Sequence, residues 1–194
     1  MRVRFALAIS AILLSAAFAR AEPATPTRAE EAVEQALTAE IDRVRSEQAR
    51  SAPHLKSDDE LLRIARARSD AMAHGTAPFA HDDGNGNYPA IDMVKQRFGP
   101  FGFIGENIYE EWRTEGPFDA AAFAAHAAKS WMESEEHRDN ILSPDYDSSG
   151  IGVVVVGDKA FATQVFRGPP PPPERAPPPK AKKAPSATWL PGAW

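Results

Sequence analysis

The sequence contains no cysteine, and this absence excludes several classes of protein at once. The chain has no disulfide framework, no thiolate nucleophile, and no cysteine to hold zinc or an iron–sulfur cluster. Long hydrophobic runs are also lacking, because the most apolar stretch, residues 5–19, is shorter than the roughly 18–20 residues that cross a bilayer. The 194 residues, 43% hydrophobic and 25% charged, otherwise suit one globular domain with extensions.

The apolar stretch lies at the N-terminus and has the three parts of a secretory signal. Arg2 and Arg4 precede it, and the small-residue site Ala19-Arg20-Ala21 follows it. We therefore expect residues 1–21 to be a cleaved signal peptide, and an uncleaved anchor is the alternative. The mature chain would then have no membrane span and would be secreted or periplasmic.

The charge is unevenly distributed along the chain. Without the signal peptide, 27 acidic residues face 19 basic ones, and the C-terminal residues 168–194 carry a net charge of +3. Residues 22–167 therefore carry about −11. A body this acidic repels a phosphate backbone, so we expect no nucleic-acid partner.

Residues 22–167 show helical patterns first and a β-hairpin last. Apolar residues at spacings of three and four predict helices, the first two of which open on the capping boxes Thr27/Glu30 and Ser57/Glu60. Alternating residues predict a strand at 103–109 and a hairpin of 151–156 with 161–166, after a break at 148–150. The helices are expected at 27–48, 57–74 and 88–98, and as an alanine-rich helix opened by Pro117. Helices followed by a hairpin indicate an α+β fold.

From their composition, we expect residues 168–194 to form a proline-rich, mostly disordered tail. Prolines at 169–173 and 177–179 cannot donate ladder hydrogen bonds and favour polyproline II. We interpret the tail as a spacer that contacts the cell envelope. A peptide ligand of the PxxP type, at 170–173, is the alternative.

An acidic, glycine-rich segment at 82–87 has some of the alternating oxygen ligands of a calcium loop. Its pattern fails as an EF-hand, because Tyr88 replaces the required glycine and Val94 the required glutamate. We expect a turn built from asparagine and glycine.

Glu106 stands among apolar residues, and a buried carboxylate needs a partner. Two explanations are open at this point. A guanidinium such as that of Arg138 would lock the last loop onto the strand. Alternatively, His81 and His137 would join Glu106 around a divalent ion with open coordination positions.

Five motifs together resemble the CAP/SCP superfamily, which includes cysteine-rich secretory proteins, antigen 5 and pathogenesis-related protein 1. The order and spacing resemble its cysteine-free bacterial branch over roughly residues 35–166. The motifs are Phe79-Ala80-His81, Gly105-Glu106-Asn107-Ile108, Trp131 with His137 to Leu142, Gly150 to Val153, and Thr163 to Phe166.

The resemblance implies an α-β-α sandwich, with a small antiparallel sheet between helix layers, and a cleft that in some members binds a divalent cation such as zinc. His81 and Glu106 match two cleft positions, but Ser134 and Phe161 replace the family's second glutamate and second histidine. His137 is the bacterial-type substitute, so His81, Glu106 and His137 are the predicted ligand and metal residues. The predicted supporting residues around them are Asn107, Arg138 and Asn140.

The incomplete set favours a non-catalytic binding module that takes a lipid, glycan or peptide ligand or a weakly held divalent ion. One alternative is a metal-assisted hydrolase of peptide or envelope polymer, with Glu106 as third ligand or general base. Another is a purely structural envelope protein that acts through its tail.

Overall fold

The structure, a computed structural model, describes residues 25–49, 52–99, 102–112 and 119–170. The predicted signal peptide and residues 171–194 of the predicted tail lie outside these ranges. The elements are α1 (Arg28–Gln48), β1 (Lys56–Ser57), α2 (Asp59–Ala73), α3 (Pro89–Phe98), β2 (Ile104–Trp112), α4 (Ala120–Glu133), α5 (Glu135–Leu142), β3 (Ser148–Val156) and β4 (Lys159–Arg167).

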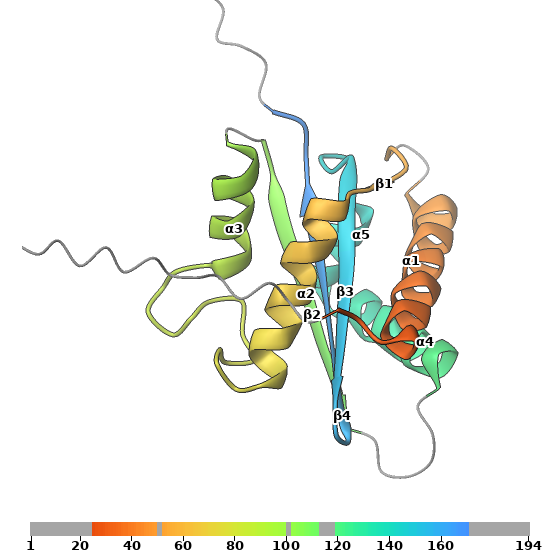
Figure 1. The fold of residues 1–194 in the computed structure, drawn as a ribbon. Coiled ribbons are helices and arrows are strands. Elements are labelled where there is room, and N and C mark those ends of the chain that lie inside the picture. The colour runs from red at the N-terminus through yellow and green to blue at the C-terminus, as the bar shows by residue number, and fades with distance from the viewer. Residues whose placement is uncertain (1–24, 50–51, 100–101, 113–118, 171–194) are drawn as a thin grey trace, which may run out of the picture.

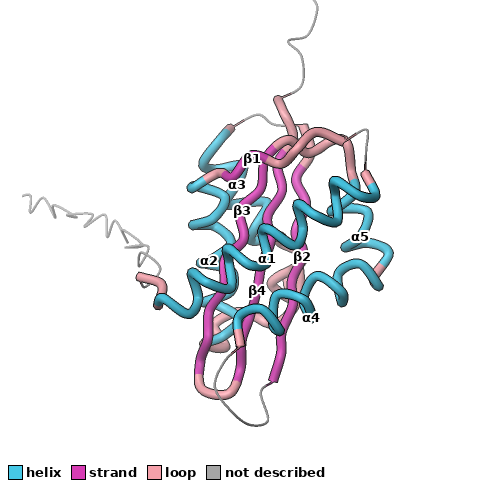
Figure 2. Tube along the Cα trace, turned by 90° about the vertical axis from the view of Figure 1, so that its right-hand side faces the viewer, coloured by secondary structure: helices cyan, strands magenta, loops and turns pink. Residues whose placement is uncertain are grey.

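The elements form three layers, with the sheet in the middle. Figure 1 shows α2 and α3 on one side of the sheet and α1 and α4 on the other, and Figure 2 shows α1 and α4 crossing the same face. The larger core cluster joins α1, α4 and α5 to the sheet around Trp131 and Phe166, while a smaller one joins α2 and α3 around Leu61 and Val165. The predicted α-β-α sandwich is confirmed.

The sheet has the strand order β1-β3-β4-β2. β3 and β4 form the predicted antiparallel hairpin, and β2 pairs antiparallel with β4 along its whole length. The short β1 adds a two-residue parallel pairing to β3, which the sequence pattern did not predict. β2 therefore forms one edge of the sheet, and β3 with β1 forms the opposite edge.

The expected break at 148–150 is wrong, because these residues begin β3. The glycines serve helix packing instead. A Cβ at Gly150 would lie 2.1 Å from the backbone nitrogen of Leu62, and one at Gly152 would lie 2.1 Å from that of Arg66. Both glycines therefore allow the backbone of α2 to lie directly on β3.

Helix starts follow the local capping chemistry. The Thr27/Glu30 box is formed as predicted. At α2 the cap is Asp58, which accepts from two backbone amides, because Ser57 belongs to β1. At α4 the cap is Asp119, which accepts from the amides of Ala121 and Ala122, and Pro117, where this helix was expected to open, lies outside the described residues.

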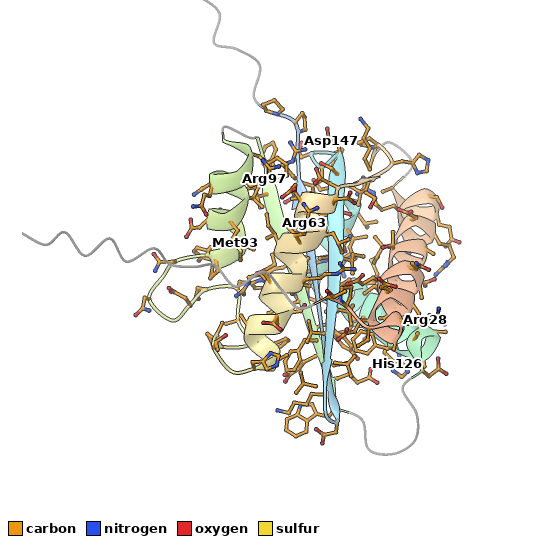
Figure 3. The ribbon with its side chains drawn as sticks, viewed as in Figure 1. Arg28, Arg63, Met93, Arg97, His126 and Asp147 are labelled. Carbon is orange, nitrogen blue, oxygen red and sulfur yellow. The ribbon has the colours of Figure 1, made fainter. Side chains whose placement is uncertain are left out.

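The carboxylate of Glu60 links α2 to α3, the two helices on one side of the sheet. Glu60 of α2 pairs with Arg63 one turn along the same helix and with Arg97 of α3, whose Nε lies 2.9 Å from its Oε2. Figure 3 labels both arginines on their neighbouring helices. These pairs are solvent-exposed, so they orient α3 more than they stabilise it.

Two glutamates of α1 cover the edge of β3 beyond β1. Glu34 Oε1 accepts from the amide of Val153 at 3.1 Å, and Glu30 Oε1 accepts from the amide of Val155 at 2.8 Å. Arg66 of α2 donates from Nε and Nη2 to the two oxygens of Glu34, at 2.7 and 2.5 Å. Side chains thus take the place of a further strand on an edge that would otherwise expose its amides.

Candidate functional site

The side chain of Glu106 on β2 is only 6% exposed and has two ionisable partners. Arg68 Nε donates to its Oε1 at 2.9 Å, and His81 Nδ1 donates to its Oε2 at 2.9 Å. Both carboxylate oxygens are therefore engaged, which satisfies a charge that would be costly to bury alone. The expected burial of Glu106 is confirmed.

The guanidinium partner of Glu106 is Arg68 of α2, and the suggestion of Arg138 is wrong. Arg138 donates to the carbonyl of Met132 instead, at 3.1 Å, and so holds the turn between α4 and α5. Arg68 is 1% exposed, and its Nη2 also donates to the carbonyl of Ala80 at 2.8 Å. The same guanidinium thus fixes Glu106 and the segment that carries His81. Its place on the apolar stripe of α2, between Leu61 and Met72, was the signal that sequence reasoning missed.

His81 and His137 lie against one another, and we call them the histidine pair. Their Nε2 atoms are 3.4 Å apart, and their rings meet edge to face with centroids 5.5 Å apart. The Glu106 contact assigns the proton of neutral His81 to Nδ1, which leaves a lone pair on Nε2. The side chain of His81 is 37% exposed, so the pair is accessible from solvent.

The surroundings favour the neutral form of His137. Burial lowers the pKa of His137 below its ordinary value of 6.5, and the neighbouring His81 lowers it further, against smaller opposing effects of Glu136 and Glu106. A neutral imidazole is the form that binds metal ions.

Two asparagines position the elements that carry the site. Asn107 Nδ2 donates to the carbonyl of His137 at 3.1 Å, and Asn140 Nδ2 donates to Asn107 Oδ1 at 2.9 Å and to the carbonyl of Glu106 at 3.3 Å. Tyr146 completes the network by donating to Asn140 Oδ1 at 3.2 Å. Asn107 and Asn140 thus join β2 to α5, and their predicted supporting roles stay a prediction.

Gly105 makes this network possible. A Cβ at this position would lie 2.6 Å from the hydroxyl of Tyr146 and 2.7 Å from Asn140 Oδ1. A larger residue would therefore push α5 and its His137 away from β2.

The two departures from the family pattern have ordinary structural roles. Phe161 is buried with Met72 and Ile108 and contacts Phe79 edge to face, with ring centroids 6.2 Å apart. Ser134 is the residue at which α4 ends and α5 begins.

Within the described ranges, no group of three or more histidine, aspartate or glutamate side chains is arranged to hold a metal ion. The histidine pair nevertheless fits two positions of one ion. Zn–N distances of about 2.0–2.1 Å and tetrahedral angles give an N···N separation of about 3.3–3.4 Å. Glu106 touches the pair only through His81 Nδ1, so its predicted place as a third ligand stays a prediction.

The acidic segment at 82–87 is the turn that we expected. Asp83 Oδ1 accepts from the backbone amides of Asn85 and Asn87, and Gly84 and Gly86 have φ values of 82° and 85°. The oxygens of Asp83 are thus used within the turn.

Comparison with known proteins agrees with this geometry. The model of the cysteine-rich secretory protein family, CAP, matches residues 38–166, which is more than half of the chain. The chain belongs to the CAP family. Its own lack of cysteine places it among members that fold without disulfides.

An uncharacterised protein of Bacillus subtilis, YkwD, is 33% identical over 114 residues, which make up 59% of this chain and 39% of YkwD. An extracellular SCP-domain protein of Bacillus anthracis has a TM-score of 0.55 at 27% identity, covering 72% of this chain and 41% of that one. This CAP chain thus spans about two fifths of either relative.

An outer surface protein of Borrelia burgdorferi has a TM-score of 0.59 at 17% identity, covering 74% of this chain and 96% of that one. At this identity the likeness concerns the fold alone. No helix in the described parts of the chain is long and apolar enough to cross a bilayer.

Proposed function

We propose that this CAP protein is exported and uses the histidine pair to bind a divalent transition-metal ion, whose remaining positions take a further ligand. The observation that carries the proposal is the 3.4 Å separation of the two Nε2 atoms. It is supported by the carboxylate on His81 Nδ1, which orients the ring, as carboxylates behind metal-bound histidines do.

An ion held by two protein ligands keeps open coordination positions. A structural metal site is closed by four protein ligands, so the histidine pair is not of that kind. The open positions can instead take a small acidic or polar group of a ligand. The solvent exposure of His81 gives such a ligand access.

Binding is favoured over hydrolysis by the state of Glu106. A general base must reach the water that it deprotonates, but both oxygens of Glu106 are occupied by Arg68 and His81. These contacts support a role for Glu106 in positioning the His81 ring.

Export is supported by the signal pattern at residues 1–21 and by the similarity to the B. anthracis SCP-domain protein, which is extracellular. The ligand classes considered from sequence, lipid, glycan and peptide, are proposals for what completes the coordination of the ion.

The test is calorimetric titration of metal-free protein with Zn²⁺, Ni²⁺ and Cu²⁺. We expect one ion per chain, and we expect His81→Asn and His137→Asn each to weaken binding by at least about tenfold. His126→Asn is the matched control, because His126 on α4 is an exposed imidazole whose Nδ1 lies 3.1 Å from Glu111 Oε2 (Figure 3). Equal loss in all three variants, or no binding by the unaltered chain, would overturn the proposal.

Glu106→Gln tests the positioning role separately. Removing a carboxylate behind a metal-bound histidine costs about 10–100-fold in affinity. We expect a loss in this range with one ion still bound. An unchanged affinity would show that Glu106 does not act through His81, and a complete loss would favour Glu106 as a direct ligand.

A further inference from the structure

A groove lies at the opposite edge of the sheet from Glu106 and its histidine pair. It measures about 500 Å³, runs between α1 and α2 and opens onto the edge of β3 next to β1; Figure 1 looks onto this edge. We call it the α1–α2 groove. Its volume lies in the range typical of ligand sites, about 300–1,000 Å³. The residues that line it include Glu31, Asp42, Leu55, Leu62, Arg66 and Ile151.

The groove is acidic at its rim. Arg66 is the only basic side chain among the described residues that line it, and its charge is matched by Glu34. Glu31 and Asp42, both exposed on α1, add two further carboxylates to the lining, which therefore holds three acidic side chains against one basic one. Since residues 22–167 are also strongly acidic, the groove complements a cationic ligand.

The groove floor combines apolar side chains with strand backbone. Leu55, Leu62 and Ile151 supply the apolar surface. In a strand, the backbone groups of every second residue face the same edge. On β3, the carbonyl of Ser149 accepts from the amide of Asp58, and the amide of Val153 donates to Glu34, so both residues face the outer edge. The amide and carbonyl of Ile151 therefore face the same edge, between the stretch covered by β1 and that covered by α1.

The spacing of the rim charges matches a short extended chain. Glu31 and Asp42 are eleven residues apart on one helix, which is about 16 Å along its axis. The first and fifth residues of an extended peptide lie about 13 Å apart, and their side chains point to the same face. The length of a lysine or arginine side chain at each end covers the remaining distance.

We propose that the α1–α2 groove binds an extended peptide with lysine or arginine at two positions four residues apart, and that the peptide adds to the β3 edge at Ile151. The basic side chains meet Glu31 and Asp42, while a middle residue pairs its backbone with Ile151. Small or β-branched side chains between them pack on Leu55 and Leu62.

The probe is a fluorescent, acetylated and amidated peptide of sequence KTVTK, titrated against the full mature chain at low salt. We expect saturable binding that weakens by at least about tenfold when both lysines are replaced by glutamate. A KTPTK peptide lacks the central N–H and should bind at least about fivefold more weakly. Equal binding of KTVTK and KTPTK would overturn the strand addition, and no binding of KTVTK at millimolar concentration would overturn the site.

The protein variants locate the peptide. We expect the double variant Glu31→Lys/Asp42→Lys to bind KTVTK at least about tenfold more weakly. Glu133→Lys/Asp158→Lys, which makes the same charge change at two exposed positions outside the groove, should bind within twofold of the unaltered chain. Equal weakening by both doubles would show that net charge alone attracts the peptide and would overturn the proposal.

Two further readouts separate this site from the histidine pair. The amide resonances of Gly150 and Ile151 should shift on peptide addition, and His81→Asn should leave peptide binding intact. Loss of peptide binding in His81→Asn would place the peptide at the other edge of the sheet and overturn the groove.

Discussion

Arg68 supports the histidine pair through Glu106 and through the residue before His81. It neutralises a carboxylate that is 6% exposed and ties the segment before His81 to α2. The sequence predicted that Glu106 would need a partner, but four arginines lie in α2 and α3 alone, and sequence spacing does not show which of them faces β2. Only the packing of α2 on the sheet selects Arg68.

We expect Arg68→Met to lower the free energy of unfolding by about 3–5 kcal/mol, because it leaves Glu106 buried with a single partner. Arg138→Met is the matched control, since Arg138 is half-buried and donates to one carbonyl, and should cost about 1 kcal/mol. Urea denaturation at pH 7 measures both. A similar cost for the two variants would contradict the assigned role of Arg68.

His137 makes metal binding depend on pH. Burial and His81 lower its pKa, so in the folded chain it stays neutral to a lower pH than its ordinary value of 6.5. We expect the gain in Zn²⁺ affinity of the unaltered chain over His137→Asn to be constant above this value and to shrink as the pH is lowered below it, where protons compete for the His137 ring. Zn²⁺ titrations of both chains between pH 5 and pH 8 measure this gain, and a gain that shrinks already above pH 7 would contradict the expectation.

The same pKa sets the sign of the stability change. A histidine whose pKa is lowered by folding binds fewer protons in the folded than in the unfolded chain. Its contribution is therefore complete above pH 6.5 and is lost as the pH falls below it. His137→Asn should flatten the decrease in unfolding free energy between pH 6.5 and pH 5. An unchanged slope would show that His137 is not the group responsible.

For helices and strands, hydrophobic periodicity and capping motifs predicted the position of an element where the signal lies within that element. The first helix, the third helix and the hairpin lie where spacing placed them, because their signals lie within a few residues of one another. The failures concern residues whose role is set by a distant neighbour. Gly150 looked like a chain break but is the surface on which α2 packs, and Ser57 looked like a cap but pairs with β3.

Glu34 connects three elements, because its carboxylate on α1 accepts from the edge of β3 and pairs with Arg66 of α2. Glu34→Ala removes the acceptor of the Val153 amide and leaves Arg66 without its partner. We expect a loss of about 2–4 kcal/mol in unfolding free energy, and a smaller loss of about 1–2 kcal/mol for Glu34→Gln, which keeps an acceptor for the amide. Thermal and urea denaturation measure both variants.

The matched control for this prediction is Glu40→Ala. Glu40 lies on the same helix and also pairs with an arginine, but Arg43 and Glu40 are 52% and 31% exposed. An exposed pair of this kind contributes little to stability, so we expect Glu40→Ala to be tolerated. If Glu34→Ala and Glu40→Ala were equally tolerated, the edge of β3 would not depend on α1.

For the whole molecule, the family and its layered architecture followed from five motifs, but the state of the site did not. The motifs name His81, Glu106 and His137, whereas only the structure shows that Glu106 bonds to His81 Nδ1 while the two imidazoles meet at their Nε2 atoms. The α1–α2 groove had no sequence signal, because its lining comes from α1, α2, β1 and β3 with no common spacing.

The C-terminal boundary of the folded body can be tested by truncation. Residue 167 was the expected boundary, but Gly168 donates to the carbonyl of Phe103 at 2.8 Å, and Gly102 donates to that of Pro169 at 3.0 Å. These bonds fix the entry to β2, two residues before Glu106. A chain that ends at residue 170 should therefore melt at the same temperature as the full mature chain, whereas one that ends at 167 should lose about 1–2 kcal/mol. Differential scanning calorimetry of the two truncations measures this. Equal stability would show that residues 168–170 belong with the tail, and a large loss already at 170 would show that residues 171–194 contribute to the folded body.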